Sequence, residues 1–167
     1  MQDIPSIWQH LLGEIAWGVG RGHGSFLHLE FGSPHISVRE PATPRAATSS
    51  KAQRVLLRRH VHIEGDWTLW IEYGDWRLQT AHGELDSEVS PCSLADECLS
   101  DLDGQQLLAV DAGPRPNSTV FRFDLGAVLQ VWPSAEISDT QWTLKSRDGF
   151  VAFFGHDGSL RVETQKP

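Results

Sequence analysis

Histidine and carboxylate side chains two positions apart are the first candidates for chemistry in this chain of 167 residues. Alternate residues of a strand point the same way, so His28 and Glu30 would share one strand face. His60 and His62 would share a face of another strand. Imidazole and carboxylate groups bind metal ions and transfer protons. The two pairs converge only if their strands are neighbours, and no His-Glu-x-x-His or other metal-binding spacing occurs. We therefore assign neither a metal nor a cofactor.

A glycine-rich segment, W-G-V-G-R-G-H-G at residues 17–24, is the second candidate. A dinucleotide-binding loop needs G-x-G-x-x-G between a strand and a following helix. Here the run leads into a strand, so we interpret it as a bulged or twisted strand or a tight turn that uses the conformational freedom of glycine. Arg21 and His23 are the side chains that it would present to a partner. A small-ligand, metal or enzymatic site would combine His23 with His28 and Glu30.

Tryptophan side chains beside acidic residues are typical of the energetic centres of protein interfaces. Trp70, Trp76 and Trp132 do not all fit on one buried face, and Asp75 precedes Trp76 directly. We predict a protein-binding surface that contains Trp70, Asp75 and Trp76. The alternative is that these rings fill the second layer of a sandwich.

Charge is distributed unevenly along the chain. Arg54, Arg58 and Arg59 belong to a basic stretch, whereas residues 78–114 contain acidic side chains and no Lys or Arg. A basic strand with aromatic neighbours can bind single-stranded nucleic acid, but the net charge of −8 opposes this and favours a basic partner. Nucleic-acid binding through these three arginines is therefore an alternative to protein binding.

The sequence contains no G-x-S-x-G motif, and neither Cys92 nor Cys98 has a histidine close by in the sequence. We assign no catalytic residue and leave enzymatic activity open. The cysteine spacing matches neither a zinc site nor a C-x-x-C motif, so both thiols are expected to be reduced, with Cys98 packed against the core.

The elements that position these side chains are mainly strands. Alternating apolar residues predict a strand at 26–31 that forms a hairpin with 36–38. They also predict a long strand at 55–63 and a central strand within 66–78. Turn residues then separate six further predicted strands, at 107–112, 120–125, 128–131, 142–144, 150–154 and 160–162.

Two helices are expected, at 5–12 and 90–103, from apolar residues at helical spacing. Residues 41–52 include two prolines and no large apolar side chain, which predicts an exposed flexible loop within a single domain that spans 1–167.

Strands outnumber helices and no β-α-β alternation occurs. The predicted fold class is α+β, mainly antiparallel β, as a curved sheet or a two-layer meander or sandwich with one or two short helices.

The N-terminus reads M-Q-D-I-P, without a basic region followed by an apolar one, and no later stretch is long and apolar enough to span a bilayer. We therefore expect a cytoplasmic protein that does not associate with a membrane.

Three quoted motifs resemble those of a group of small uncharacterised bacterial proteins that carry them in the same order. They are W-G-V-G-R-G-H-G-S-F-L-H-L-E-F-G at 17–32, G-D-W-T-L-W-I-E-Y-G-D-W-R-L at 65–78 and L-D-G-Q-Q-L-L-A-V at 102–110. The resemblance covers most of the chain and implies a shared fold but no assigned chemistry. Acidic β-rich bacterial proteins of this size are similar to immunity or accessory proteins. The expected function is that of a bacterial interaction protein, an immunity protein that neutralises a basic toxin or an accessory subunit, acting by protein–protein binding.

Overall fold

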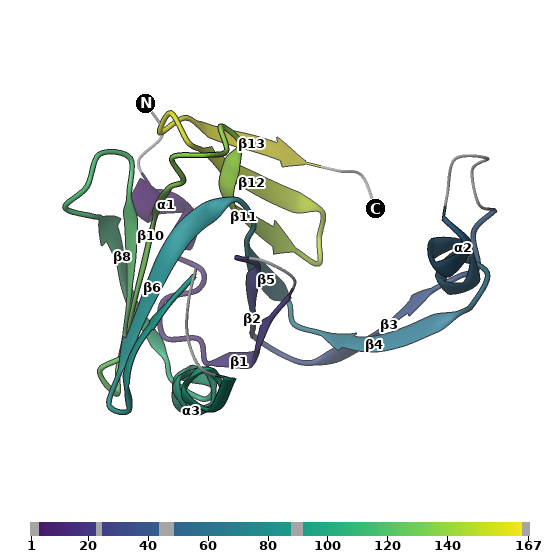
Figure 1. The fold of residues 1–167 in the computed structure, drawn as a ribbon, viewed down its shortest axis with the longest axis horizontal. Coiled ribbons are helices and arrows are strands. Elements are labelled where there is room, and N and C mark those ends of the chain that lie inside the picture. The colour runs from purple at the N-terminus through teal and green to yellow at the C-terminus, as the bar shows by residue number, and fades with distance from the viewer. Residues whose placement is uncertain (1–3, 23–24, 44–48, 88–91, 165–167) are drawn as a thin grey trace.

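Two antiparallel sheets and a separate two-stranded ribbon form most of the structure, a computed structural model that describes residues 4–22, 25–43, 49–87 and 92–164 (Figure 1). The six-stranded sheet has the order β1 (Ala16–Arg21), β2 (Leu27–Phe31), β5 (Trp67–Ile71), β11 (Thr140–Ser146), β12 (Phe150–Gly155), β13 (Leu160–Thr164). The five-stranded sheet has the order β7 (Gly83–Asp86), β6 (Gly74–Thr80), β10 (Val128–Pro133), β9 (Thr119–Phe123), β8 (Leu107–Ala112). The predicted α+β class with mainly antiparallel β-structure is confirmed.

One hydrophobic core joins the two large sheets. Trp8, at the end of α1 (Ile4–Trp8), is fully buried, and its ring lies 5.1 Å from that of Phe121 on β9 and 5.2 Å from that of Trp142 on β11. The indole nitrogen of Trp142 also donates a hydrogen bond of 3.1 Å to Thr119 Oγ1 across the core. Large aromatic rings therefore connect the two sheets, and the burial of their apolar surface stabilises this packing. We call the two large sheets with α1 and α3 the body.

The helix α3 (Cys92–Leu102) covers β1, β6 and β7 at one side of the body (Figure 1). Leu94, Cys98 and Leu102 face the core, and Cys98 is buried as the sequence predicts. The N-terminal helix is shorter than predicted, because the chain continues from Trp8 through turns, although Leu11 still reaches the core.

The strands predicted in the second half of the chain are confirmed as β8 to β13, with end points that differ by a few residues. Gly126, Gly149 and Gly158 have φ angles of 96°, 88° and 80°, so the turns between these strands use the left-handed region that glycine enters at little cost. The glycine-rich segment itself becomes β1, with a register shift between Trp17 and Gly20 that confirms a bulged strand.

The predicted hairpin between 26–31 and 36–38 is wrong. Strand β2 is paired on one side with β1 and on the other with β5, so both of its edges are occupied. Residues 36–38 belong to β3 (His35–Arg39), which pairs only with β4 (His60–Glu64). The glycine-rich strand β1 pairs with one edge of β2 and β5 pairs with the other, so no edge of β2 is left for residues 36–38.

The predicted long strand at 55–63 is confirmed at 60–63 and wrong at 55–59, and the predicted loop at 41–52 is wrong in part. Helix α2 (Ser50–Leu56) begins after Ser49, whose side chain accepts a hydrogen bond of 3.3 Å from Ala52 N, and β4 starts only at His60. Residues 41–43 and 49–52 are exposed or half-buried, and 44–48 lie outside the described residues. Local capping and helix propensity outweigh the alternation of Val55 and Leu57.

The segment 66–78, predicted as one central strand, forms two strands in different sheets. β5 is an internal strand of the six-stranded sheet, as predicted, but the chain then crosses at Glu72 and Tyr73 to enter the five-stranded sheet as β6. A change of sheet reverses which alternate side chains face the core, so the face assigned from β5 does not extend to β6.

Candidate functional site

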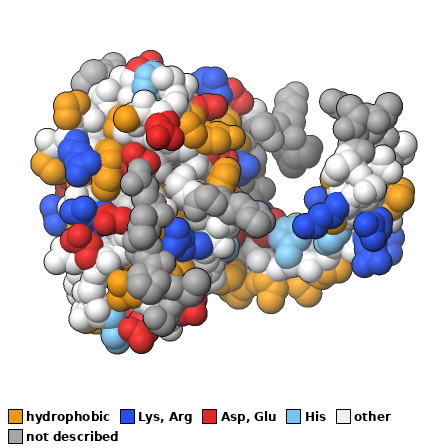
Figure 2. Space-filling view, in the orientation of Figure 1, with side chains coloured by type: hydrophobic (Ala, Val, Ile, Leu, Met, Phe, Trp, Pro, Cys, Tyr) orange, Lys and Arg blue, Asp and Glu red, His pale blue; other side chains and the backbone are white. Residues whose placement is uncertain are grey.

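The structure places β3, α2 and β4, residues 35–64, as an arm that projects from the body (Figure 1). Ile36 lies opposite Ile63 and Val38 opposite Val61 in the antiparallel ribbon. These four side chains, 71 %, 49 %, 64 % and 63 % exposed in the order Ile36, Val38, Val61 and Ile63, form what we call the apolar face of the arm. Figure 2 shows hydrophobic atoms gathered along one edge of this projection. Contiguous apolar patches are unusual on soluble proteins and mark interaction sites.

Hydrogen bonds fix the base of the arm to the body. Glu30 on β2 is only 8 % exposed, and its Oε2 accepts hydrogen bonds from Gly65 N at 2.9 Å and from Thr68 Oγ1 at 2.7 Å. Between the two connections that join arm and body, Asp66 Oδ2 accepts a hydrogen bond of 2.8 Å from Ser33 N. The direction of the arm is therefore set before any partner binds, which lowers the entropic cost of binding.

Close backbone packing reinforces this base. A Cβ atom at Gly65 would lie 2.4 Å from the carbonyl oxygen of Phe31, a distance that side chains do not tolerate. Gly32 has a φ of 76°, and a Cβ there would lie 2.9 Å from Asp66 Oδ2. Both connections between body and arm consequently need glycine.

The opposite face of the arm is polar and borders an open cleft of about 810 Å³ between arm and body, which we call the histidine cleft. Its side chains include His35, His62 and Glu64 from the arm and His28, Glu30, Trp70, Lys145 and Arg147 from the body. His62 Nε2 forms a hydrogen bond with Glu64 Oε1, and the His28 ring lies 5.2 Å from that of Trp70. The predicted approach of the two histidine pairs occurs in part, because His28, Glu30 and His62 border the same cleft. Their strands, β2 and β4, are not paired with each other.

The predicted ligand or metal site of His23, His28 and Glu30 stays a prediction, although Glu30 has other contacts. The Glu30 carboxylate holds the arm base, and His60 Nε2 lies 3.0 Å from Val55 O, towards α2. His23 lies outside the described residues. Among the side chains that the structure describes, no group of three His, Cys, Asp or Glu is placed to hold a metal ion.

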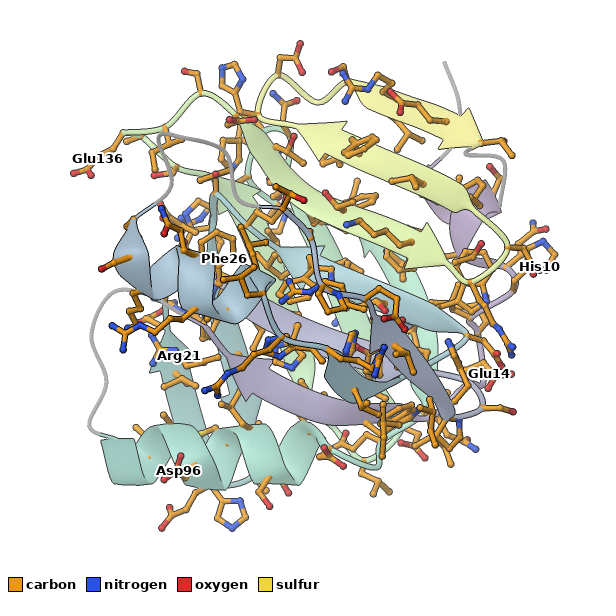
Figure 3. All side chains as sticks on the ribbon, turned by 90° about the vertical axis from the view of Figure 1, so that its right-hand side faces the viewer. His10, Glu14, Arg21, Phe26, Asp96 and Glu136 are labelled. Carbon is orange, nitrogen blue, oxygen red and sulfur yellow. The ribbon has the colours of Figure 1, made fainter. Side chains whose placement is uncertain are left out.

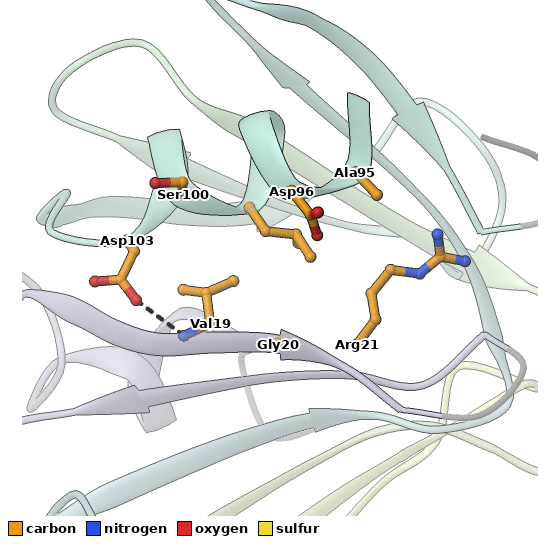
Figure 4. Close-up of a pocket in the computed structure, with 8 residues that line it drawn as sticks. Val19, Gly20, Arg21, Ala95, Asp96, Ser100 and Asp103 are labelled. Carbon is orange, nitrogen blue, oxygen red and sulfur yellow. Dashed lines mark hydrogen bonds between the residues drawn. The ribbon is translucent and has the colours of Figure 1, made fainter. Parts of the chain in front are cut away.

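Arg21 borders a groove of about 830 Å³ between helix α3 and strand β1, which we call the α3–β1 groove (Figure 4). Val19, Ala95 and Leu99 supply its apolar lining, and Asp96 and Asp103 its carboxylates. Figure 3 shows Arg21 on β1 and Asp96 on α3, on the same side of the molecule. The groove combines apolar surface with negative charge.

Two of the predicted binding residues, Arg21 and Trp76, are neighbours, but only Arg21 is accessible. The Arg21 guanidinium lies 5.4 Å from the Trp76 ring centre and donates a hydrogen bond of 3.2 Å to Ser87 O. Trp76 is fully buried and donates to Ser25 O at 2.5 Å, so its prediction as an exposed binding side chain is wrong. The change of sheet between β5 and β6 turns this ring into the core.

Trp70 and Asp75 are not brought together. Trp70 is half-buried on the outer face of the six-stranded sheet, where it borders the histidine cleft. Asp75 lies in the five-stranded sheet opposite Trp132. Burial raises the pKa of Asp75, against the hydrogen bond from Ser134, which lowers it. The Trp132 ring is half-buried beneath the Arg115 guanidinium, 3.9 Å from the ring centre.

The predicted nucleic-acid surface is located on the arm. Arg54 belongs to α2, and Arg58 and Arg59 follow it, so these residues form a helix end and a turn and not the predicted strand. Arg59 is engaged with Glu40 through hydrogen bonds of 2.8 to 3.0 Å. Residues 35–64 contain no Phe, Tyr or Trp, so histidine rings are the only ones in the arm available for base stacking.

The feature that sequence reasoning missed is the exposure of the apolar face of the arm. The alternation of Val61 and Ile63 with His60 and His62 predicts an apolar face, but it does not determine whether that face is buried or exposed. Ser49 followed by helix-forming residues was a signal for α2 that a search for caps could have found.

Comparisons with protein-family models, curated proteins and solved structures found no match to this chain. The resemblance to a group of bacterial proteins therefore stays a prediction. None of the helices in the described part of the chain has the length and apolar character needed to cross a membrane.

Proposed function

We propose that this chain is a protein-binding protein that presents its arm to a partner. The observation that carries the proposal is the set of four exposed, paired aliphatic side chains on the arm, Ile36, Val38, Val61 and Ile63. The body also has exposed aliphatic residues, such as Leu108 and Leu125, but in the arm four of them lie opposite one another on two paired strands. A fixed base and an apolar surface are what a docking element requires.

The arm and the body have opposite formal charges and therefore favour different partners. Residues 35–64 contain six Lys or Arg and two Glu, a formal charge of +4. Since the net charge of the chain is −8, the remaining residues carry −12. An arm partner is favoured to have acidic groups around an apolar surface. The acidic body favours a basic partner. The proposal therefore includes the role of a bacterial cytoplasmic immunity protein or accessory subunit.

Site-specific photo-crosslinking in the native host tests the role of the arm. A photoreactive amino acid replaces Val61 on the arm, and the matched control replaces Leu108 on β8, which is 55 % exposed. We expect specific adducts at position 61 and none at position 108, because both are exposed aliphatic strand residues and only one belongs to the apolar face. Absence of adducts at both positions, or equal adducts at both, contradicts the proposal.

A further inference from the structure

The arm combines positive formal charge with an exposed apolar face, and the α3–β1 groove combines apolar lining with carboxylates. The arm carries Ile36, Val38, Val61 and Ile63 with basic residues nearby, and the groove has apolar side chains beside carboxylates. We propose that the arm of one copy docks in the α3–β1 groove of a second copy. This inference rests on the proposed function of the arm and names its partner.

Charge complementarity favours this arrangement over the pairing of two arms. Two arms of formal charge +4 repel each other when their apolar faces are stacked. The groove offers net negative charge, since two carboxylates, Asp96 and Asp103, border it together with one cation, Arg21. Electrostatic attraction then orients the arm as it approaches the body of the second copy.

The groove also offers apolar surface where the arm needs it. Val19, Ala95 and Leu99 lie along it, and Val19 and Leu99 pack against the main core, so this lining is held in place. The Asp103 carboxylate accepts a hydrogen bond of 3.1 Å from Val19 N, which connects the turn after α3 to β1 at the end of the groove away from Arg21 (Figure 4). Contact between this lining and the apolar face would remove both from water.

The arm cannot reach the groove of its own chain. Its base is held by Glu30 and Asp66, and it extends away from the body, whereas α3 lies along the body itself (Figure 1). The contact therefore has to be made between copies. Because the two surfaces differ, each copy offers one arm and one groove, which permits a reciprocal dimer, a closed ring or an open chain.

The size of the surface indicates which residues must take part. A stable interface buries roughly 800 Å² on each partner, which is more than the four aliphatic side chains of the arm supply. The neighbouring basic residues are therefore required, and Arg58 is the best one to test, because it is exposed and has no carboxylate partner among the described residues.

Sedimentation velocity on the full chain over a range of concentrations tests the inference. We expect concentration-dependent association that weakens at high salt. Arg58→Glu and Asp96→Arg should each weaken association by about tenfold or more, because each places like charges in the contact. Glu97→Arg is the matched control: it makes the same charge change one residue along α3, at a position that does not border the groove. It should leave association nearly unchanged.

Mixing the two charge-reversed proteins provides the sharpest readout. In a mixed assembly, the reversed arm meets the reversed groove and the unchanged arm meets the unchanged groove, so opposite charges face each other at both contacts. We expect the equimolar mixture to associate as the wild type does, while each protein alone stays largely monomeric. Thermal unfolding of each variant confirms that it is folded.

Three results would overturn the inference: a chain that stays monomeric at every concentration, an association that Asp96→Arg leaves unchanged, or a loss of association that mixing the two variants does not restore. Crosslinking at Val61 separates these from failure of the proposed function. Arm-specific adducts to a different protein leave the docking role of the arm intact and remove only the second copy as its partner.

Discussion

The body and the arm treat apolar side chains in opposite ways. In the body, Trp8, Trp76 and Trp142 are fully buried. The indole nitrogens of Trp76 and Trp142 donate hydrogen bonds to Ser25 O and Thr119 Oγ1, and the Trp8 ring packs against Phe121 and Trp142. In the arm, Ile36 and Ile63 lie opposite each other with most of their surface in water. The described residues of the arm supply no second layer over its apolar face, and isolated hairpins are marginally stable. Its order depends on attachment to the body, and its free face is available for docking.

The largest effect is expected from Trp142→Ala in the body. This change leaves a cavity between the sheets and removes the hydrogen bond to Thr119, so the free energy of unfolding should fall by about 3–5 kcal/mol. Trp132→Ala is the control, because that ring is only half-buried; its partial burial and its contact with Arg115 together are worth about 1–2.5 kcal/mol. Urea unfolding measures both. Equal losses would mean that the two sheets do not share one aromatic core.

The same substitution in each region compares them directly. Ile71→Thr places a hydroxyl in the buried face of β5 and should lower the free energy of unfolding by about 2–4 kcal/mol. Ile63→Thr changes an exposed arm residue and should shift it by no more than about 0.5 kcal/mol. If Ile63→Thr destabilised the protein as strongly as Ile71→Thr, the apolar face of the arm would be covered within the chain.

The attachment of the arm is tested by Glu30→Gln. The neutral amide weakens the hydrogen bonds from Gly65 N and Thr68 Oγ1, and we expect a loss of about 1.5–3 kcal/mol, since these bonds involve a charged acceptor. Hydrogen exchange should rise throughout β3 and β4 and change little in β9. Glu40→Gln, at an exposed ion pair with Arg59, is the control and should cost at most about 1 kcal/mol. Unchanged exchange in β3 and β4 would contradict the role of Glu30 at the arm base.

The smallest effect concerns two carboxylates of the body with opposite pKa shifts. Burial raises the pKa of Asp75, so its contribution to stability is present at acid pH and is lost as the pH rises through its folded-state pKa. Asp75→Asn should therefore raise the thermal midpoint slightly at neutral pH, by about 1–2 °C at most, and not in acid. Thermal scans at both pH values check this.

Asp157 provides the control of opposite sign. Hydrogen bonds from the Ser159 side chain and backbone lower the pKa of Asp157, so its contribution is present above the unfolded-state pKa and is lost in acid. Asp157→Asn should lower the thermal midpoint at neutral pH. A fall in the midpoint at neutral pH for Asp75→Asn would contradict the effect of burial at that carboxylate.

Prediction from sequence succeeded where local patterns are sufficient. Leu27, Leu29 and Phe31 alternate with polar residues, and all three are buried in β2. Asp148-Gly149 and Asp157-Gly158 mark turns whose backbone angles need glycine. It failed for Trp76, since alternation continues across Tyr73 while the chain moves from one sheet to the other. It failed also for residues 50–56, where a capped helix contains an alternating apolar pair.

By itself, the sequence determined the class of the fold, the later strands, the helix α3 and the uneven distribution of charge, because these depend on residue type and short-range spacing. Tertiary structure alone decided which strands are neighbours, and thereby that β2 pairs with β5 and that β3 and β4 leave the body. Strand pairing joins residues far apart in the chain, so periodicity carries no information about it. The alternation of Val61 and Ile63 is the same whether a second sheet or water covers them; here no second layer of the described chain does, and the apolar face of the arm is the result.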